Sequence, residues 1–153
     1  MWEAFQRFRT LDPKAQRIFG RAVILLPWVM ASLRLRGFKK TQARLQEKLP
    51  SIPDGAIASA GPIVQTICRM VKAAGHYGLA HPNCLEESLV LWYFLHREHV
   101  SVALRIGVRK VQGEFQAHAW VEYQGAALNQ GEWTRPHYAA FETEFSQLPG
   151  ENT

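Results

Sequence analysis

The sequence predicts an α+β fold, with helices in the first part of the chain and an antiparallel sheet after them. Apolar residues recur at spacings of three and four up to about Arg97, and from Val102 they alternate with polar ones. Elements of one type are therefore grouped along the chain, which is typical of the α+β class. With 153 residues, of which 47% are hydrophobic and 20% charged, the chain has the composition of a globular protein. A chain of this length can bury enough surface to fold without disulfides or metals.

Helical spacing of apolar residues dominates the first fifty positions. Asp12 is suited to cap a helix whose first residue is Pro13, where the missing N–H group has no consequence. Because proline removes a backbone donor, we expect this helix to kink or break at Pro27. The other helical stretches expected here are residues 2–9, 29–35 and 41–49.

Charge is distributed unevenly along the chain. Residues 1–50 contain eleven Lys and Arg against three Asp and Glu, a net charge of +8, whereas the remainder has a net charge of −3. The change coincides with residues 50–55, a stretch rich in proline and glycine that reads as a linker. We therefore predict a basic helical region over 1–50 and a core domain over 56–153. The basic region suggests an acidic partner or an anionic membrane surface, and a solvated helical face is the alternative.

The longest apolar run, residues 22–33, is interrupted by Pro27 and flanked by Arg21 and Arg34. Its twelve residues fall short of the ~20 that a membrane-spanning helix needs. No signal-peptide cleavage site follows it, and two cysteines are too few for a disulfide scaffold. We therefore expect a soluble, cytoplasmic protein. Nucleic-acid binding is not expected, because the basic residues are scattered among apolar helical positions without a recognised module.

Two further helices are expected after the linker. One begins at Gly61 and is ended by Gly75. The next begins after Asn83, and Glu86 lies three residues later, which is the capping-box spacing with asparagine as the cap. Apolar residues on one face continue this second helix to about Arg97.

The pattern of residues then changes to that of strands. Alternation begins at Val102, and a second strand covers residues 117–123. Gln124 and Gly125 form a two-residue turn, from which a third strand returns to about Gln130. These strands form an antiparallel sheet.

Cys84 is the first candidate for a chemical role, because it is the first residue of a capped helix. Unpaired N–H groups and the helix dipole favour negative charge at that position, and the thiolate is the nucleophilic form of cysteine. The alternative is a small buried hydrophobe, which is the usual role of a free cysteine. Cys68 lies in the middle of a helix at core spacing, and we assign it that structural role.

A thiolate nucleophile needs a base, and His118 is the best placed of the six histidines. It lies in a predicted strand, which holds its side chain rigidly. The other histidines fall in polar or loop-like stretches and are expected to be solvated: His76, His81, His96, His99 and His137. None of them has a convincing metal-ligand spacing, so we expect no metal site.

The predicted hairpin selects a group that could orient the base. With a two-residue turn, Trp120 faces Asn129, and Asn129 becomes the diagonal neighbour of His118 on the same face, at ~7–8 Å. Gln130 points to the other face unless the turn has three residues. The sequence therefore predicts a Cys84–His118–Asn129 arrangement, in which Asn129 fixes the tautomer of the base.

These residues lie in blocks that resemble a known family. The blocks are Pro-Asn-Cys-Leu-Glu-Glu-Ser-Leu-Val-Leu-Trp at 82–92, Leu-Arg-Ile-Gly-Val-Arg at 104–109, and Ala-His-Ala-Trp-Val-Glu at 117–122 followed by Gly125. In this order they are similar to the lasso peptide B proteins, which are transglutaminase-like leader peptidases. The resemblance covers about residues 60–131, and the preceding apolar, arginine-rich helices resemble the N-terminal part of the stand-alone form.

The resemblance implies a papain-like or transglutaminase-like fold, in which a helix bearing the nucleophile packs on an antiparallel sheet. It implies a cysteine protease, without a cofactor, that removes the leader from a ribosomally made precursor. A separate leader-recognition protein would deliver the precursor, and an ATP-dependent macrolactam cyclase would close the ring on the freed core.

Carried onto this chain, the resemblance makes Cys84 the nucleophile and His118 the base. The family commonly has aspartate at the third position, where this sequence offers Asn129 or Gln130. The backbone N–H of Cys84, with Asn83 as a second candidate, would stabilise the oxyanion.

Two other functions remain open at this point. A non-catalytic scaffold could use the same fold to bind the precursor or the cyclase. An amine acceptor in place of water would give transamidation through the same acyl-enzyme.

Overall fold

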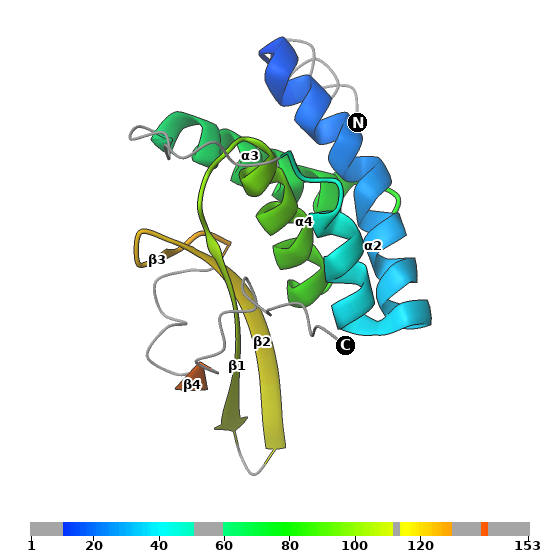
Figure 1. Ribbon diagram of the computed structural model, residues 1–153, viewed down its shortest axis with the longest axis vertical. Helices are drawn as coiled ribbons and strands as arrows, with labels where there is room; N and C mark the ends of the chain where they lie inside the picture. Colours follow the sequence, from blue (N-terminus) through cyan, green and yellow to red (C-terminus); the bar gives the residue numbers. More distant parts are fainter. Residues whose placement is uncertain (1–10, 51–59, 112–113, 130–138, 141–153) are drawn as a thin grey trace, which may run out of the picture.

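The computed structural model describes residues 11–50, 60–111, 114–129 and 139–140 (Figure 1). Within these residues three helices precede an antiparallel sheet, so the predicted α+β class is confirmed. The sheet has the strand order β3-β2-β1-β4. The predicted helix at 2–9 lies outside the described residues, as does nearly all of the predicted linker. The elements are α2 (Pro13–Gln46), α3 (Gly61–Tyr77), α4 (Cys84–Arg97), β1 (Ala103–Val111), β2 (Glu114–Tyr123), β3 (Ala126–Ala127) and β4 (Ala139–Ala140).

The predicted break at Pro27 is wrong, because α2 continues through this residue. Ala22, Leu26 and Val29 are fully buried on both sides of the proline. The burial of this continuous apolar face outweighs the one helical hydrogen bond that proline removes. The separate helix predicted at 29–35 is therefore part of α2.

The interruption of α2 occurs instead at Gly37, whose backbone has φ 78° and ψ 176°. A positive φ of this kind favours glycine. The chain reverses here, and the residues after Gly37 return beside those before it (Figure 1). Ser32 Oγ and Thr41 Oγ1 lie 2.9 Å apart across the reversal, and Thr41 Oγ1 also donates to the Gly37 carbonyl at 2.8 Å. The predicted helix at 41–49 is the returning arm, and it ends at Gln46.

The apolar run at residues 22–33 lies in a longer helical element than the sequence predicts. The run belongs to the first arm of α2, and among the described residues α2 is the element that meets the length and composition criteria for crossing a membrane. The apolar window of this helix is 28% buried, and core helices of soluble proteins meet the same criteria.

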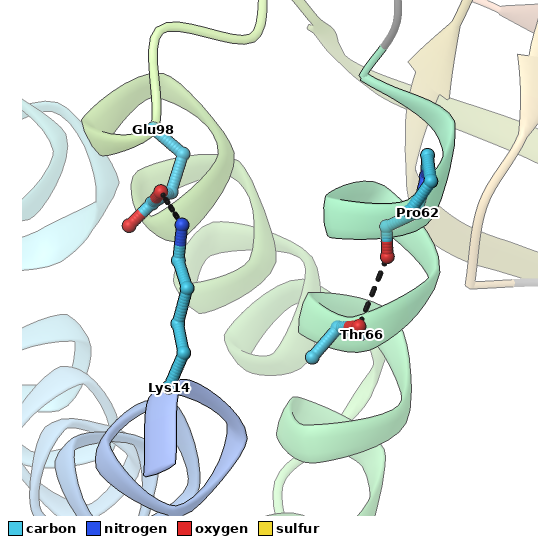
Figure 2. A network of polar contacts seen from close by, with 4 residues as sticks. All are labelled: Lys14, Pro62, Thr66 and Glu98. Atoms are coloured by element: carbon cyan, nitrogen blue, oxygen red, sulfur yellow. Dashed lines mark hydrogen bonds and ion pairs between the residues drawn. The ribbon is translucent and has the colours of Figure 1, made fainter. Parts of the chain in front are cut away.

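The helices share one hydrophobic core with the sheet. Its fully buried members include Leu26 from α2, Val71 from α3, Leu91 from α4 and Leu104 from β1. An ion pair of 2.7 Å between Lys14 Nζ and Glu98 Oε2 joins the start of α2 to the end of α4 (Figure 2). The core thus draws on both sides of the predicted boundary, and the division into 1–50 and 56–153 stays a prediction.

The helix α3 begins at Gly61, as predicted, with Pro62 in its first turn. Thr66 Oγ1 donates to the Pro62 carbonyl at 2.9 Å within this turn (Figure 2). The helix runs past the predicted end at Gly75 to Tyr77. Gly75 has a different explanation, because a Cβ atom there would lie 3.0 Å from the Pro82 ring. The glycine lets the segment that leads to α4 pack against α3.

The strands β1 and β2 form most of the sheet. Leu104 pairs with Val121 and both are buried against the helices, whereas the far end of the hairpin, at Glu114, is exposed. The predicted strand at 117–123 begins three residues earlier, at Glu114. The returning strand ends at Ala127 rather than near Gln130, and β4, which pairs with β1, is not predicted from the sequence.

Candidate functional site

Cys84 is the first residue of α4, and the predicted capping box is confirmed. The Asn83 Oδ1 atom accepts hydrogen bonds from the backbone N–H groups of Leu85 and Glu86, each at 3.0 Å. In return, the Glu86 carboxylate accepts from the Asn83 N–H at 2.8 Å. Glu86 is 5% exposed, whereas Asn83 is exposed, so the cap lies at the surface with its glutamate side buried.

The capping box leaves one N–H group at this helix end unused. The first four N–H groups of a helix have no acceptor within the helix. Three of them, from Asn83, Leu85 and Glu86, are bound in the cap, and none of these bonds uses the Cys84 N–H. A carbonyl carbon attached to the Cys84 sulfur would place its oxygen near this donor, which is the requirement for an oxyanion site.

The two cysteines have different surroundings. Cys68 lies in the middle of α3, where burial and the nearby Glu87 charge raise the pKa of its thiol to about 11. It is protonated at neutral pH, which agrees with the structural role predicted for it. Cys84 is partly exposed at the N-terminus of α4. Both cysteines are partly exposed, and Cys84 is the one that lies at a helix N-terminus, as predicted for a nucleophile.

Side chains from α4 and from the loop after β3 complete the hydrogen bonding of β2. Every second residue of a strand directs its backbone groups to the same side, and Val121 O accepts from Leu128 N on the β3 side at 2.9 Å. Beyond the end of β3, the Asn129 Oδ1 atom accepts from Val121 N at 2.9 Å, and Ser88 Oγ donates to Ala119 O at 3.0 Å. Asn129 Nδ2 then donates to Ser88 Oγ at 2.8 Å. We call Ser88 and Asn129, with these bonds, the latch.

The latch joins the helix that carries Cys84 to the strand that carries His118. Ser88 follows Cys84 by one helical turn on the same side of α4, about 6 Å along the axis. Its hydroxyl binds the carbonyl of Ala119, which directly follows His118. The pairing of the thiol with the imidazole stays a prediction.

The neighbours of His118 in the sheet leave room for its ring. Its partner on β1 is Gly107, and Gly107 pairs on its other side with Ala140 of β4. Because Gly107 has no side chain, nothing larger than a hydrogen atom lies next to the imidazole at the paired position on β1. Along β2, the Trp120 ring stacks at 6.3 Å between centroids and 23° between planes. Trp120 is 5% exposed and the His118 Nε2 atom is buried, so the ring lies in a shielded place.

The remaining predicted site residues have defined positions or lie outside the described part. Asn129 does not continue a strand opposite Trp120, because β3 has ended, and its amide binds Val121 and Ser88. Its orienting role toward His118 stays a prediction beside this structural one. The oxygen of Asn83 is used in the cap, so only its Nδ2 group could serve as an oxyanion donor. Gln130 lies outside the described residues.

Sequence reasoning missed two residues on α4 and β2. Ser88 connects the helix of Cys84 to the strand of His118, and its signal was the spacing of four from Cys84 on one helical face. Trp120 flanks the imidazole, and its signal was the spacing of two from His118 in a strand.

Burial shifts the pKa values of two side chains of α4, Glu87 in its first turns and His96 in its last turn. Burial raises the pKa of Glu87 above its usual 4.5, although Lys72 opposes the shift. Burial lowers the pKa of His96 below 6.5, opposed by a hydrogen bond of its Nδ1 to the Trp92 carbonyl at 3.0 Å. Among the described residues no three His, Cys, Asp or Glu side chains are grouped so as to hold a metal ion.

Comparison with known proteins gives one family match. The sequence model of the transglutaminase-like superfamily matches residues 22–143, which include α2, α3, α4 and all four strands described, apart from the start of α2. No curated protein and no solved structure matches the chain.

Proposed function

Since the chain belongs to the transglutaminase-like superfamily, which includes cysteine peptidases, we propose that it is a cysteine peptidase of lasso peptide biosynthesis. Its substrate would be a ribosomally made precursor, from which it removes the leader. The observation that carries the proposal is the position of Cys84. It begins a capped helix that the Ser88–Ala119 hydrogen bond fixes beside the strand of His118.

In the proposed reaction, the Cys84 thiolate attacks the carbonyl carbon of the peptide bond, and the Cys84 N–H stabilises the oxyanion. His118 gives a proton to the leaving amine, which departs as the new N-terminus of the core peptide. A thioester with the leader remains. His118 then accepts a proton from a water molecule, whose oxygen attacks the thioester and releases the leader as a carboxylic acid.

The proposed partners follow from the same biosynthetic role. A separate leader-recognition protein would present the precursor, and an ATP-dependent macrolactam cyclase would use the freed core. The reaction would take place in the cytoplasm, where the basic region around α2 could contact either protein or an anionic membrane surface.

The test is to incubate the purified chain with a candidate precursor and recognition protein and to measure product masses. We expect cleavage at one peptide bond, with the two product masses adding to that of the precursor plus one water. Cys84→Ala should lower kcat/KM by at least about 10³-fold, as should His118→Ala. Cys68→Ala is the matched control and should cleave at the rate of the unmodified chain.

Two other results would replace the proposal. Intact precursor with every variant, although the partners bind, would make the chain a scaffold for the precursor or the cyclase. A product joined to an amine, without the added mass of water, would make the reaction a transamidation.

A further inference from the structure

A groove far from Cys84 lies between the first arm of α2 and the last turns of α4. Its volume is about 380 Å³. Residues from both helices and from the segment after α2 line it: Arg21, Ile24, Trp28, Lys48, Tyr93 and Arg97.

The lining of the groove has one sign of charge. Arg21, Lys48 and Arg97 line it, and none of the described lining residues is an aspartate or glutamate. The Lys48 ammonium lies 5.1 Å from the centre of the Trp28 ring, and Arg97 Nη1 donates to the Tyr93 hydroxyl at 3.3 Å. These contacts hold the cations at the groove without neutralising them, so the groove attracts anions.

The groove also has an apolar wall that is exposed to water. Ile24 is 74% exposed at its edge, and Trp28, which is partly exposed, contributes aromatic surface. An inorganic anion would leave this wall in water. A ligand that carries apolar side chains as well as negative charge would use both parts of the lining.

The hollow shape of the groove favours a peptide over a membrane surface as its ligand. A membrane binds an apolar face that enters the headgroup layer. Here the aromatic side chains line a hollow between two helices, and its volume is near the lower end of the ~300–1,000 Å³ found for small-ligand sites. A hollow of this size accommodates one or two side chains of an extended chain.

We infer that this groove binds an acidic segment of the peptide substrate that carries an aliphatic or aromatic side chain. The inference rests on the proposed function, because it adds a second contact for the substrate of the peptidase. Tyr93 and Arg97 lie nine and thirteen residues after Cys84, about 14 and 20 Å along α4. An extended peptide covers at most about 3.4 Å per residue. The acidic segment must therefore lie at least about four to six residues from the cleaved bond.

Other segments or molecules could in principle fill the groove, and each differs from an acidic peptide substrate in charge or in its effect on binding. The first ten residues carry two arginines and one glutamate, which is the wrong sign for a basic groove. Residues 141–145, Phe-Glu-Thr-Glu-Phe, have the same chemistry as the inferred ligand and are a competing occupant within the chain. The remaining alternative ligands of the groove are a second copy of the chain and an anionic lipid surface.

The test measures peptide binding by full-length Cys84→Ala protein, which cannot cleave the probe. The probe is a fluorescent peptide Glu-Leu-Glu-Phe-Glu-Glu, and its control has glutamine in place of every glutamate. We expect saturable binding of the acidic peptide only, weakened by salt, as measured by fluorescence anisotropy. Lys48→Glu should weaken it by at least about tenfold. Lys39→Glu changes the net charge equally at an exposed lysine outside the groove and should leave the affinity within about twofold.

Ile24→Ser tests the apolar wall without threatening the fold, because this side chain is already exposed. It should weaken binding of the acidic peptide by about threefold or more, since part of the apolar contact is lost.

Four results would overturn the inference. The first is an equal loss of peptide affinity in Lys48→Glu and Lys39→Glu, and the second is binding of phosphatidylglycerol vesicles without binding of the peptide. The third is dimerisation that Lys48→Glu abolishes, and the fourth is tighter peptide binding after removal of residues 141–153. The last result would assign the groove to the chain's own C-terminal segment.

Kinetics keep this inference separate from the proposed function. In the cleavage-competent chain, Lys48→Glu should raise KM for an acidic precursor and leave kcat unchanged. Peptide binding without any cleavage would reject the peptidase but keep the groove. Cleavage with a KM that Lys48→Glu does not change would reject the groove but keep the peptidase.

Discussion

Among single residues, the two cysteines offer the most direct comparison. Both are partly exposed, but Cys68 lies in the middle of α3, where burial raises its thiol pKa to about 11, whereas Cys84 is the first residue of α4. We predict that iodoacetamide at pH 7 labels Cys84 at least about tenfold faster than Cys68, as measured by peptide mass spectrometry. Cys84→Ala should remove the fast label and Cys68→Ala should retain it. Equal labelling rates would count against Cys84 as the nucleophile.

His96 predicts how stability depends on pH. Burial lowers its pKa in the folded chain below the 6.5 of the unfolded chain. Between these two values the unfolded chain binds more protons, so stability is lost as pH falls below about 6.5. His96→Gln should reduce the loss of unfolding free energy between pH 7.5 and 5.5, as measured by urea denaturation.

The control for this prediction is His76→Gln, which changes an exposed histidine of α3. It should leave the pH dependence as in the unmodified chain. If His96→Gln and His76→Gln gave the same curve as the unmodified chain, another group would determine the pH dependence.

Among the secondary-structure elements, α4 offers a test at its N-terminus, because substitutions of Asn83 can distinguish a capping role from a role as an oxyanion donor. Asn83→Ala should lower the free energy of unfolding by about 0.5–2 kcal/mol, because Leu85 and Glu86 lose their acceptor. Asn83→Ser keeps a capping oxygen but removes the amide, so stability should be nearly retained. If Asn83 Nδ2 is an oxyanion donor, Asn83→Ser should still lower kcat by about 10²-fold. An unchanged kcat would leave Asn83 with the capping role alone.

The latch between α4 and β2 gives a second test at this level. Ser88→Ala and Asn129→Ala should each lower the free energy of unfolding by about 1–3 kcal/mol, because each leaves buried polar groups without their partner. Only Asn129→Ala should shift the pH profile of kcat/KM if Asn129 also orients His118. Equal profiles in the two variants would restrict Asn129 to the latch.

Local patterns account for the elements that the sequence predicted well. The capping box, the bounds of α4 and the turn at Gln124 and Gly125 depend on residues within four positions of one another. Propensity and spacing therefore determine them. They also place Cys84 and His118 on the correct types of element.

Contacts between distant residues account for the rest. The helix continues through Pro27 because α3 and α4 bury its neighbours, and the chain reverses at Gly37 because the returning arm packs beside the first. Asn129 binds across to Ser88, 41 positions away, which no spacing rule along the chain reveals. The strand predicted to carry Asn129 opposite Trp120 ends at Ala127, and Asn129 binds Ser88 and Val121 through its side chain instead.

For the molecule as a whole, the shared core predicts that the helices cannot be removed. Ala22, Leu26 and Leu45 of α2 are buried against the later elements. A chain of residues 56–153 should therefore expose this apolar surface and lose cooperative thermal unfolding, as measured by circular dichroism and calorimetry. A cooperative transition in that fragment would instead support two separable domains.

The latch has a consequence for the behaviour of the protein at high concentration. A strand with unpaired backbone groups is a template on which another chain can add, and such addition leads to aggregation. Where β3 stops, the carbonyl of Ala119 and the N–H group of Val121 are bound by a hydroxyl and an amide instead of by a neighbouring strand. The two side chains that join the helix of Cys84 to the strand of His118 thus also cover this part of the strand edge against pairing with other copies.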